Sequence, residues 1–109
     1  MGEANRRGHY RVVYPVAERP RLVVGSHICE VLDCSERGLR FRPCGVLGPR
    51  VGDELEGRVR LLRGEEVRIQ GTVLRHEPDD VTLLLRGSGI PFGAILHEQI
   101  YLRRAAQSA

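Results

Sequence analysis

Lysine and tryptophan are absent from this 109-residue sequence, and aromatic side chains are scarce. All 17 cationic residues are therefore arginine, a bias that a GC-rich genome would produce by itself. Arginine is nevertheless the cation best suited to planar, bidentate recognition of guanine and phosphate. Because the formal net charge is only +3, the composition predicts a soluble domain with a mild basic bias.

Long apolar runs are also missing. No stretch approaches the roughly 20 apolar residues that a membrane-spanning helix requires, and the first residues show no signal-peptide pattern. We therefore expect a cytoplasmic protein without membrane insertion. The length of 109 residues and the hydrophobic share of 41% predict one domain with a modest core.

Cysteine and histidine are too few and too scattered to indicate a metal site. The three cysteines form no CxxC pair, and their odd number indicates neither a disulfide framework nor a zinc knuckle. We expect reduced thiols, as in the cytoplasm. The sequence also lacks a nucleophile–base–orienter set and a glycine-rich phosphate loop before a helix, so we expect no enzyme and no cofactor. The residues concerned are Cys29, Cys34, Cys44, His9, His27, His76 and His97.

Alternating apolar and polar residues recur in short segments along most of the chain. This period of two is typical of strands with one wet face, and regular short strands predict a small antiparallel barrel or sandwich. Gly71 lies within one such segment and suggests a β-bulge. The expected strands are 21–26, 27–33, 38–42, 54–62, 65–76 and 81–85.

A single helix is expected at the C-terminal end, at about 91–104. Pro91 suits a first helical turn, and Arg103 and Arg104 suit the negative end of the helix dipole. The apolar residues Phe92, Ile95, Leu96 and Ile100 lie near one helical face. This face predicts a helix that closes one end of the barrel; a helix that binds a partner or dimerises is the alternative.

The stretch Asp33-Cys-Ser-Glu-Arg-Gly38 reads as a tight turn between two strands. Asp33 and Ser35 can hydrogen-bond to the local backbone, and Gly38 can adopt the positive φ that such turns often need. By itself this pattern indicates only an Asx-type turn with an ordinary turn glycine. Upstream, residues 6–11 carry three arginines without apolar periodicity, which by itself indicates a solvated tail.

Together, the two stretches resemble a PilZ domain. Arg7-Gly-His-Tyr-Arg11 matches the RxxxR motif of that family, and Asp33 to Gly38 matches its DxSxxG motif, in the family's order and spacing. The resemblance extends to the C-terminal helix. It implies a six-stranded antiparallel β-barrel with a C-terminal helix, all-β in class, and a receptor for cyclic di-GMP. It divides the chain into a flexible ligand-binding arm, 1–11, and a barrel domain, 12–109.

The resemblance assigns a ligand role to each motif residue, and the chemistry of each side chain agrees. Arg7 and Arg11 suit the guanine Hoogsteen edge and phosphates, because O6, N7 and phosphate oxygens all accept hydrogen bonds. Asp33 suits the Watson–Crick edge, whose N1–H and N2–H donate. Ser35 offers a hydroxyl contact, and Gly38 lets the backbone approach the ligand closely.

Further expectations concern the arm. In PilZ domains an arginine at the position of Arg6 is associated with an intercalated ligand dimer, so the resemblance implies two ligands per chain. His9 lies inside RxxxR but is expected to be exposed. Because the arm has few apolar groups to offset the entropy of ordering, we predict that it is mobile alone and orders on the ligand, passing a signal to an unidentified effector protein.

Two other binding or structural roles compete with this interpretation. A small basic barrel could bind single-stranded nucleic acid, but the few aromatic residues argue against a base-stacking platform and no DNA is expected. A PilZ-like structural adaptor without nucleotide binding would lack the two motifs, whereas this sequence carries both. The aromatic residues are Tyr10, Tyr14, Phe41, Phe92 and Tyr101.

Overall fold

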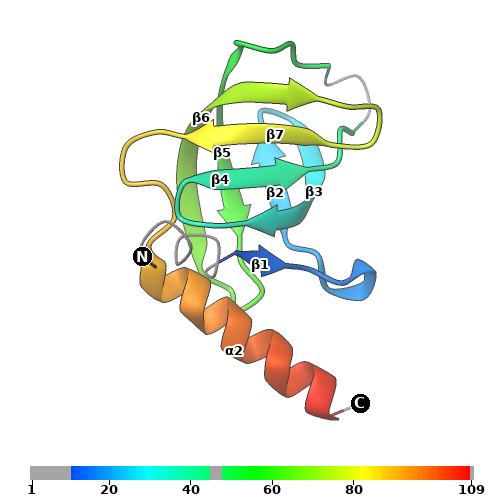
Figure 1. The fold of residues 1–109 in the computed structure, drawn as a ribbon, viewed down its shortest axis with the longest axis vertical. Helices are drawn as coiled ribbons and strands as arrows, with labels where there is room; N and C mark the ends of the chain where they lie inside the picture. Colours follow the sequence, from blue (N-terminus) through cyan, green and yellow to red (C-terminus); the bar gives the residue numbers. More distant parts are fainter. Residues whose placement is uncertain (1–10, 45–47, 109) are drawn as a thin grey trace, which may run out of the picture.

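The computed structural model describes residues 11–44 and 48–108, which form a six-stranded antiparallel barrel with one C-terminal helix (Figure 1). The predicted fold class is confirmed. A short 3-10 helix, η1 (Val16–Glu18), follows the first strand. The strands are β1 (Val12–Val13), β2 (Arg21–Val24), β3 (His27–Cys34), β4 (Gly38–Phe41), β5 (Glu54–Arg60), β6 (Glu66–His76) and β7 (Val81–Leu85).

The barrel closes through pairing between β3 and β4. The strand order around it is β3-β2-β5-β6-β7-β4, and the β3–β4 pair completes the ring. The two-residue strand β1 pairs with the end of β3 beyond β2. Closure leaves few strand edges without hydrogen-bonding partners. The alternation seen in the sequence places these apolar side chains inside: Leu22, Cys29, Val31, Leu39, Phe41, Val59, Ile69, Val73, Val81, Leu83 and Leu85.

A β-bulge at Leu32 changes which side chains of β3 face outward. Val31 lies opposite Phe41, but Asp33 lies opposite Arg40, so Leu32 is the extra residue. Residues directly opposite each other share a face of the sheet. Cys34 therefore joins Leu39 in the core, while Asp33 is turned toward the outer face with Arg40.

The bulge predicted at Gly71 is wrong in position. Gly71 pairs in register with both Leu55 and Leu85, and the irregularity of β6 falls between Val73 and Arg75. Gly71 instead fits a tight contact, because a Cβ atom there would lie 3.0 Å from the carbonyl oxygen of Leu84. A glycine within a strand indicates either a bulge or the close approach of another backbone segment. At Gly71 it is the close approach of the β7 backbone.

Helix α2 (Phe92–Ser108) begins at the end of the barrel and extends beyond it (Figure 1). The Pro91 carbonyl accepts hydrogen bonds from the amides of Ala94 and Ile95, so Pro91 precedes the helix instead of occupying its first turn. Ala94 and Ile95 are buried against the barrel. The first two turns therefore close the barrel end, as expected, through Ile95, but Phe92 and Leu96 of the predicted apolar face are exposed. The helix continues to Ser108, past the predicted end near residue 104.

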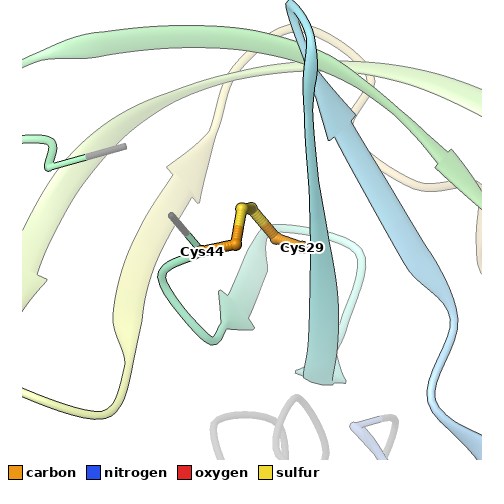
Figure 2. Close-up of a disulfide and its surroundings, with 2 residues drawn as sticks. All are labelled: Cys29 and Cys44. Carbon is orange, nitrogen blue, oxygen red and sulfur yellow. A yellow bond between two sulfur atoms is a disulfide. The ribbon is translucent and has the colours of Figure 1, made fainter. Parts of the chain in front are cut away.

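Cys29 of β3 and Cys44 after β4 form a disulfide, with their Cα atoms 5.4 Å apart (Figure 2). The expectation of three reduced thiols is therefore wrong for this pair, and Cys34 alone is a free cysteine among the described residues. The bond spans 15 positions and encloses the whole β3–β4 hairpin. It ties the base of that hairpin together.

Candidate functional site

The DxSxxG stretch forms the tip of the β3–β4 hairpin. The Ser35 amide donates to the Gly38 carbonyl at 2.8 Å, and the Gly38 amide donates back to Ser35 Oγ at 3.2 Å. Ser35 thus stabilises its own turn, as the local sequence indicated. The expected positive φ at Gly38 is wrong, because that residue is not among the glycines with left-handed backbone.

Asp33 is a buried carboxylate held between two arginines. It is 2% exposed, and its Oδ1 accepts a hydrogen bond of 2.8 Å from Arg11 Nη1. Its Oδ2 accepts a hydrogen bond from Arg40 Nε at 2.8 Å and lies 2.7 Å from Arg40 Nη2 in an ion pair. A buried charge needs such partners to offset its lost hydration. The second arginine of RxxxR and the aspartate of DxSxxG are therefore in direct contact.

Arg40 is a site residue that the sequence analysis missed. Besides Asp33, it contacts Asp80 between β6 and β7, at 3.4 Å from Nη1 to Oδ2. The hydrogen bond to Asp33 raises the pKa of Arg40 further above its ordinary value. The sequence signal was available: once Ser35 to Gly38 is read as the turn, Arg40 falls opposite Asp33 in the ladder.

The turn is also fixed from behind by the loop between β7 and α2. The Ile90 amide donates to the Glu36 carbonyl at 3.1 Å, and Arg37 Nη1 donates to the Gly87 carbonyl at 2.7 Å. Gly89 has a φ of +61°, and any Cβ at this position would overlap the Glu36 carbonyl oxygen. The backbone of Ser35 and Gly38 is therefore held in place by contacts on both sides.

This arrangement presents two guanidinium groups at the surface above a buried negative charge. The side chains of Arg11 and Arg40 are 52% and 39% exposed, whereas that of Asp33 is 3% exposed. Asp33 fixes where the two cations lie, and their outer edges remain open to solvent. Paired guanidinium groups of this kind can bind phosphate or the acceptor edge of a guanine.

The structure brings together four of the six predicted site residues, namely Arg11, Asp33, Ser35 and Gly38. Arg6, Arg7 and His9 lie outside the described residues. Within residues 11–44 and 48–108, no cluster of three or more histidine, cysteine or carboxylate side chains could hold a metal ion. The helices of the same part of the chain include none with the length and apolar character needed to cross a membrane.

Comparison with solved structures shows the same fold in three bacterial proteins. The Bacillus subtilis inhibitor of motility MotI/DgrA aligns over 91% of this chain and 50% of its own length, with 16% identity and a TM-score of 0.62. This chain thus spans half the length of that protein. The uncharacterised Legionella protein Lpg0364 aligns over 90% of this chain and 95% of its own, with 11% identity and a TM-score of 0.53.

The third structure is the Borreliella burgdorferi protein PlzA in complex with c-di-GMP. It aligns over 81% of this chain and 38% of its own, with 13% identity and a TM-score of 0.53. No curated protein sequence matches this one. The family model for the PilZ domain matches residues 5–99, which include both motifs. With that match and the closed barrel, this chain belongs to the PilZ domain family.

Proposed function

We propose that this chain is a receptor for cyclic di-GMP, and not an enzyme, with Arg6, Arg7, Arg11, Asp33, Ser35 and Gly38 forming the ligand site. One observation carries the proposal: Arg11 and Asp33 belong to different motifs, 22 positions apart, yet they contact each other at 2.8 Å. One residue of each motif thus takes part in this contact. PlzA, which shares the fold, has been solved in complex with c-di-GMP.

The geometry of Asp33 suggests how a guanine would enter. Oδ1 of Asp33 accepts a hydrogen bond from Arg11, and the Asp33 side chain is 3% exposed, so a guanine would reach this carboxylate when Arg11 moves. In our proposal, N1–H and N2–H of the guanine replace Arg11 on Oδ1, while Arg40 stays on Oδ2. Arg11 is then free to turn its donors to the Hoogsteen edge of a guanine or to a phosphate.

Titration calorimetry tests the ligand assignment. Cyclic di-GMP should bind, whereas GTP and cyclic di-AMP should not bind measurably at the same concentrations. Arg7→Ala, Arg11→Ala and Asp33→Ala should each weaken binding by about 5–150-fold, the equivalent of one good base contact. Arg75→Ala, an exposed arginine of β6, is the matched control and should change nothing. Unchanged affinity in all three site variants would exclude this site.

The number of cyclic di-GMP molecules bound per chain distinguishes a site for one ligand from a site for an intercalated pair. If Arg6 contacts the second molecule of an intercalated ligand pair, calorimetry gives two ligands per chain, and Arg6→Ala lowers this ratio to one. One ligand per chain in the unchanged protein contradicts the role of Arg6 and leaves the single-ligand site intact.

We further propose that residues 1–11 act as the switch. Cyclic di-GMP supplies the phosphates and guanines that offset the entropy of ordering this arginine-rich arm. The ordered arm then presents a new surface to an effector protein in the cytoplasm. Amide hydrogen exchange should slow in residues 2–11 when the ligand is added. Equal exchange with and without ligand would exclude the switch while leaving the binding site itself in place.

A further inference from the structure

A second surface lies away from the Arg11–Asp33–Arg40 cluster. A groove of about 900 Å³ crosses β5 and β6 between Gly25, in the β2–β3 turn, and Gly87–Gly89, in the loop before α2. Its charged lining includes the exposed side chains of Arg58 and Arg68. Arg11, Asp33 and Arg40 do not line it.

The arginines in and beside this groove are placed as like-charged neighbours. Arg58 of β5 lies directly opposite Arg68 of β6, and Arg60 of β5 lies directly opposite Arg21 of β2. Like charges at directly opposed positions repel each other. The Arg60–Arg21 pair has carboxylates on both sides, because Arg60 also lies opposite Glu66 and Arg21 lies opposite Glu30. The Arg58–Arg68 pair has none directly opposite, since Arg58 has Val23 on its other side. That pair is therefore unfavourable until an anion lies beside it.

The protein itself supplies little of that negative charge. Within the part of the chain that the structure describes, the one ion pair made by these four arginines joins Arg58 Nε to Glu66, at 4.0 Å. The acidic end of the same sheet face differs, because Glu54 pairs with Arg86 at 2.8 Å and Glu56 accepts from Gln70 at 2.8 Å. The Arg58–Arg68 pair is therefore less well neutralised than Arg86 is by Glu54.

We infer that this face docks a partner protein through an acidic segment of that partner. Carboxylates match the paired guanidinium groups of Arg58 and Arg68. Single-stranded nucleic acid fits less well, because no aromatic side chain lines the groove for base stacking and the carboxylates of Glu56 and Glu66 would repel a continuous phosphate backbone. A peptide in which acidic and polar residues alternate offers carboxylates to Arg58 and Arg68. Its polar residues can lie beside Glu56 and Glu66 without charge repulsion.

The inference identifies a docking surface for the effector of the proposed receptor. Identifying the partner as that effector rests on the proposed function. The contact itself can be measured without cyclic di-GMP. Neither Arg11 nor Asp33 lines the groove, but its Gly87 end contacts Arg37 of the DxSxxG turn. In our inference, ligand and partner bind at the same time. An effector bound to the β5–β6 face can then also contact the arm when the arm is ordered by ligand.

The probe is a fluorescein-labelled peptide of alternating glutamate and serine, followed by fluorescence anisotropy at low ionic strength. The wild-type chain should bind it saturably. The variant R58E/R68E should bind at least about tenfold more weakly, and it should instead gain affinity for a lysine–serine peptide of the same length. The control R50E/R75E reverses two exposed arginines outside the groove and should stay within about twofold of wild type.

Several results overturn the inference. The inference is wrong if the wild-type chain does not bind the glutamate–serine peptide saturably. It is also wrong if R58E/R68E and R50E/R75E lose the same affinity for this peptide. Tighter binding of an oligothymidylate of equal length, lost in R58E/R68E, would make the groove a nucleic-acid site. If R58E/R68E fails to fold by circular dichroism, R58Q/R68Q replaces it, with the same tenfold loss expected. Calorimetry with cyclic di-GMP tests the proposed function separately, because R58E/R68E should leave that affinity unchanged.

Discussion

Tyr14 donates a hydrogen bond of 2.7 Å to Glu98, 84 positions further along the chain, and this contact joins the entry of the barrel to helix α2. Glu98 is fully buried. Its oxygens also accept from the backbone amides of Leu62 and Arg63, at 3.1 and 3.2 Å, in the turn between β5 and β6. One carboxylate thus attaches the helix to two separate parts of the barrel.

Glu98→Ala should therefore destabilise the protein by about 2–4 kcal/mol, because it removes the acceptor of the buried Tyr14 hydroxyl and of two part-buried backbone amides. Glu98→Gln keeps the size but offers one acceptor oxygen, so its loss should be smaller. Urea unfolding followed by circular dichroism measures both. His97→Ala, at the neighbouring exposed position of α2, should fall within about 0.5 kcal/mol of wild type. An equal loss in His97→Ala would show that the loss does not come from the contacts of Glu98.

Much of the barrel follows from the sequence because alternation is a local property. Leu39 and Phe41 are buried while Arg40 is partly exposed, as a period of two requires. The bulge at Leu32 could not be read in the same way. Without it Asp33 would face the core, and only the pairing of β3 with β4 shows that it turns outward. Helix α2 likewise followed from its apolar spacing, but nothing local marks Glu98 as buried.

Residues far apart in the chain account for most of what the sequence did not show. The pairing of Cys29 with Cys44 depends on how the loop after β4 folds back on β3, which no spacing rule supplies. The motif pair was different, because a resemblance to PilZ domains placed Arg11 beside Asp33 in advance. Arg40 and Asp80 belong to the same cluster but were not predicted as site residues, since they lie outside both motifs.

The disulfide gives a stability prediction. Closing a loop of 15 residues removes about 3 kcal/mol of conformational entropy from the unfolded chain. Cys44→Ser should therefore lower the free energy of unfolding by about 2–4 kcal/mol under oxidising conditions. Dithiothreitol should destabilise the wild-type protein by a similar amount and leave Cys44→Ser unchanged. A wild-type melting temperature that dithiothreitol does not change would show that the bond contributes nothing in solution.

The contact between Asp33 and Arg40 predicts coupled effects on stability. Arg40→Ala removes a hydrogen bond and an ion pair from a buried carboxylate, and because Arg40 is 39% exposed the cost should be moderate, about 1–2 kcal/mol. In a double-mutant cycle with Asp33→Ala, the coupling energy should exceed about 0.5 kcal/mol. Pairing Arg75→Ala with Asp33→Ala supplies the control, and it should give additive effects. Additivity in the Arg40 cycle as well would mean that the pair is not formed in solution.

Two glycines that lie in or against the DxSxxG turn should respond oppositely to alanine. At Gly38 a Cβ would lie 3.5 Å from Ser35 Oγ, an ordinary contact, so Gly38→Ala should keep or slightly raise stability. At Gly89 the positive φ and the overlap with Glu36 should cost more than about 1 kcal/mol. If Gly38 serves the approach of cyclic di-GMP, Gly38→Ala also loses ligand affinity in calorimetry while its melting temperature holds. A Gly38→Ala protein with full affinity would remove that residue from the site.

The buried hydroxyl and thiol beneath the site predict a loss of stability at alkaline pH. Burial raises the pKa of Cys34 from 9.0 to about 12 and, together with the charge on Cys34 and the hydrogen bond to Glu98, raises the pKa of Tyr14 as well. The unfolded chain therefore loses these protons first. The free energy of unfolding should be constant with respect to both groups below about pH 8 and fall as the pH rises from about 9 toward 12.

Between about pH 8 and pH 10.5, Cys34 alone should account for about 1–2 kcal/mol of this loss, since one pKa unit corresponds to about 1.4 kcal/mol. Urea unfolding at the two pH values measures it. Cys34→Ala removes the thiol and should reduce the alkaline loss by that amount, and Tyr14→Phe should reduce it further. Because the Cys34 thiol stays protonated under acid conditions, Cys34→Ala should not alter the pH dependence below about pH 7. An alkaline loss of the same size in Cys34→Ala and wild type would place the titrating group elsewhere in the protein.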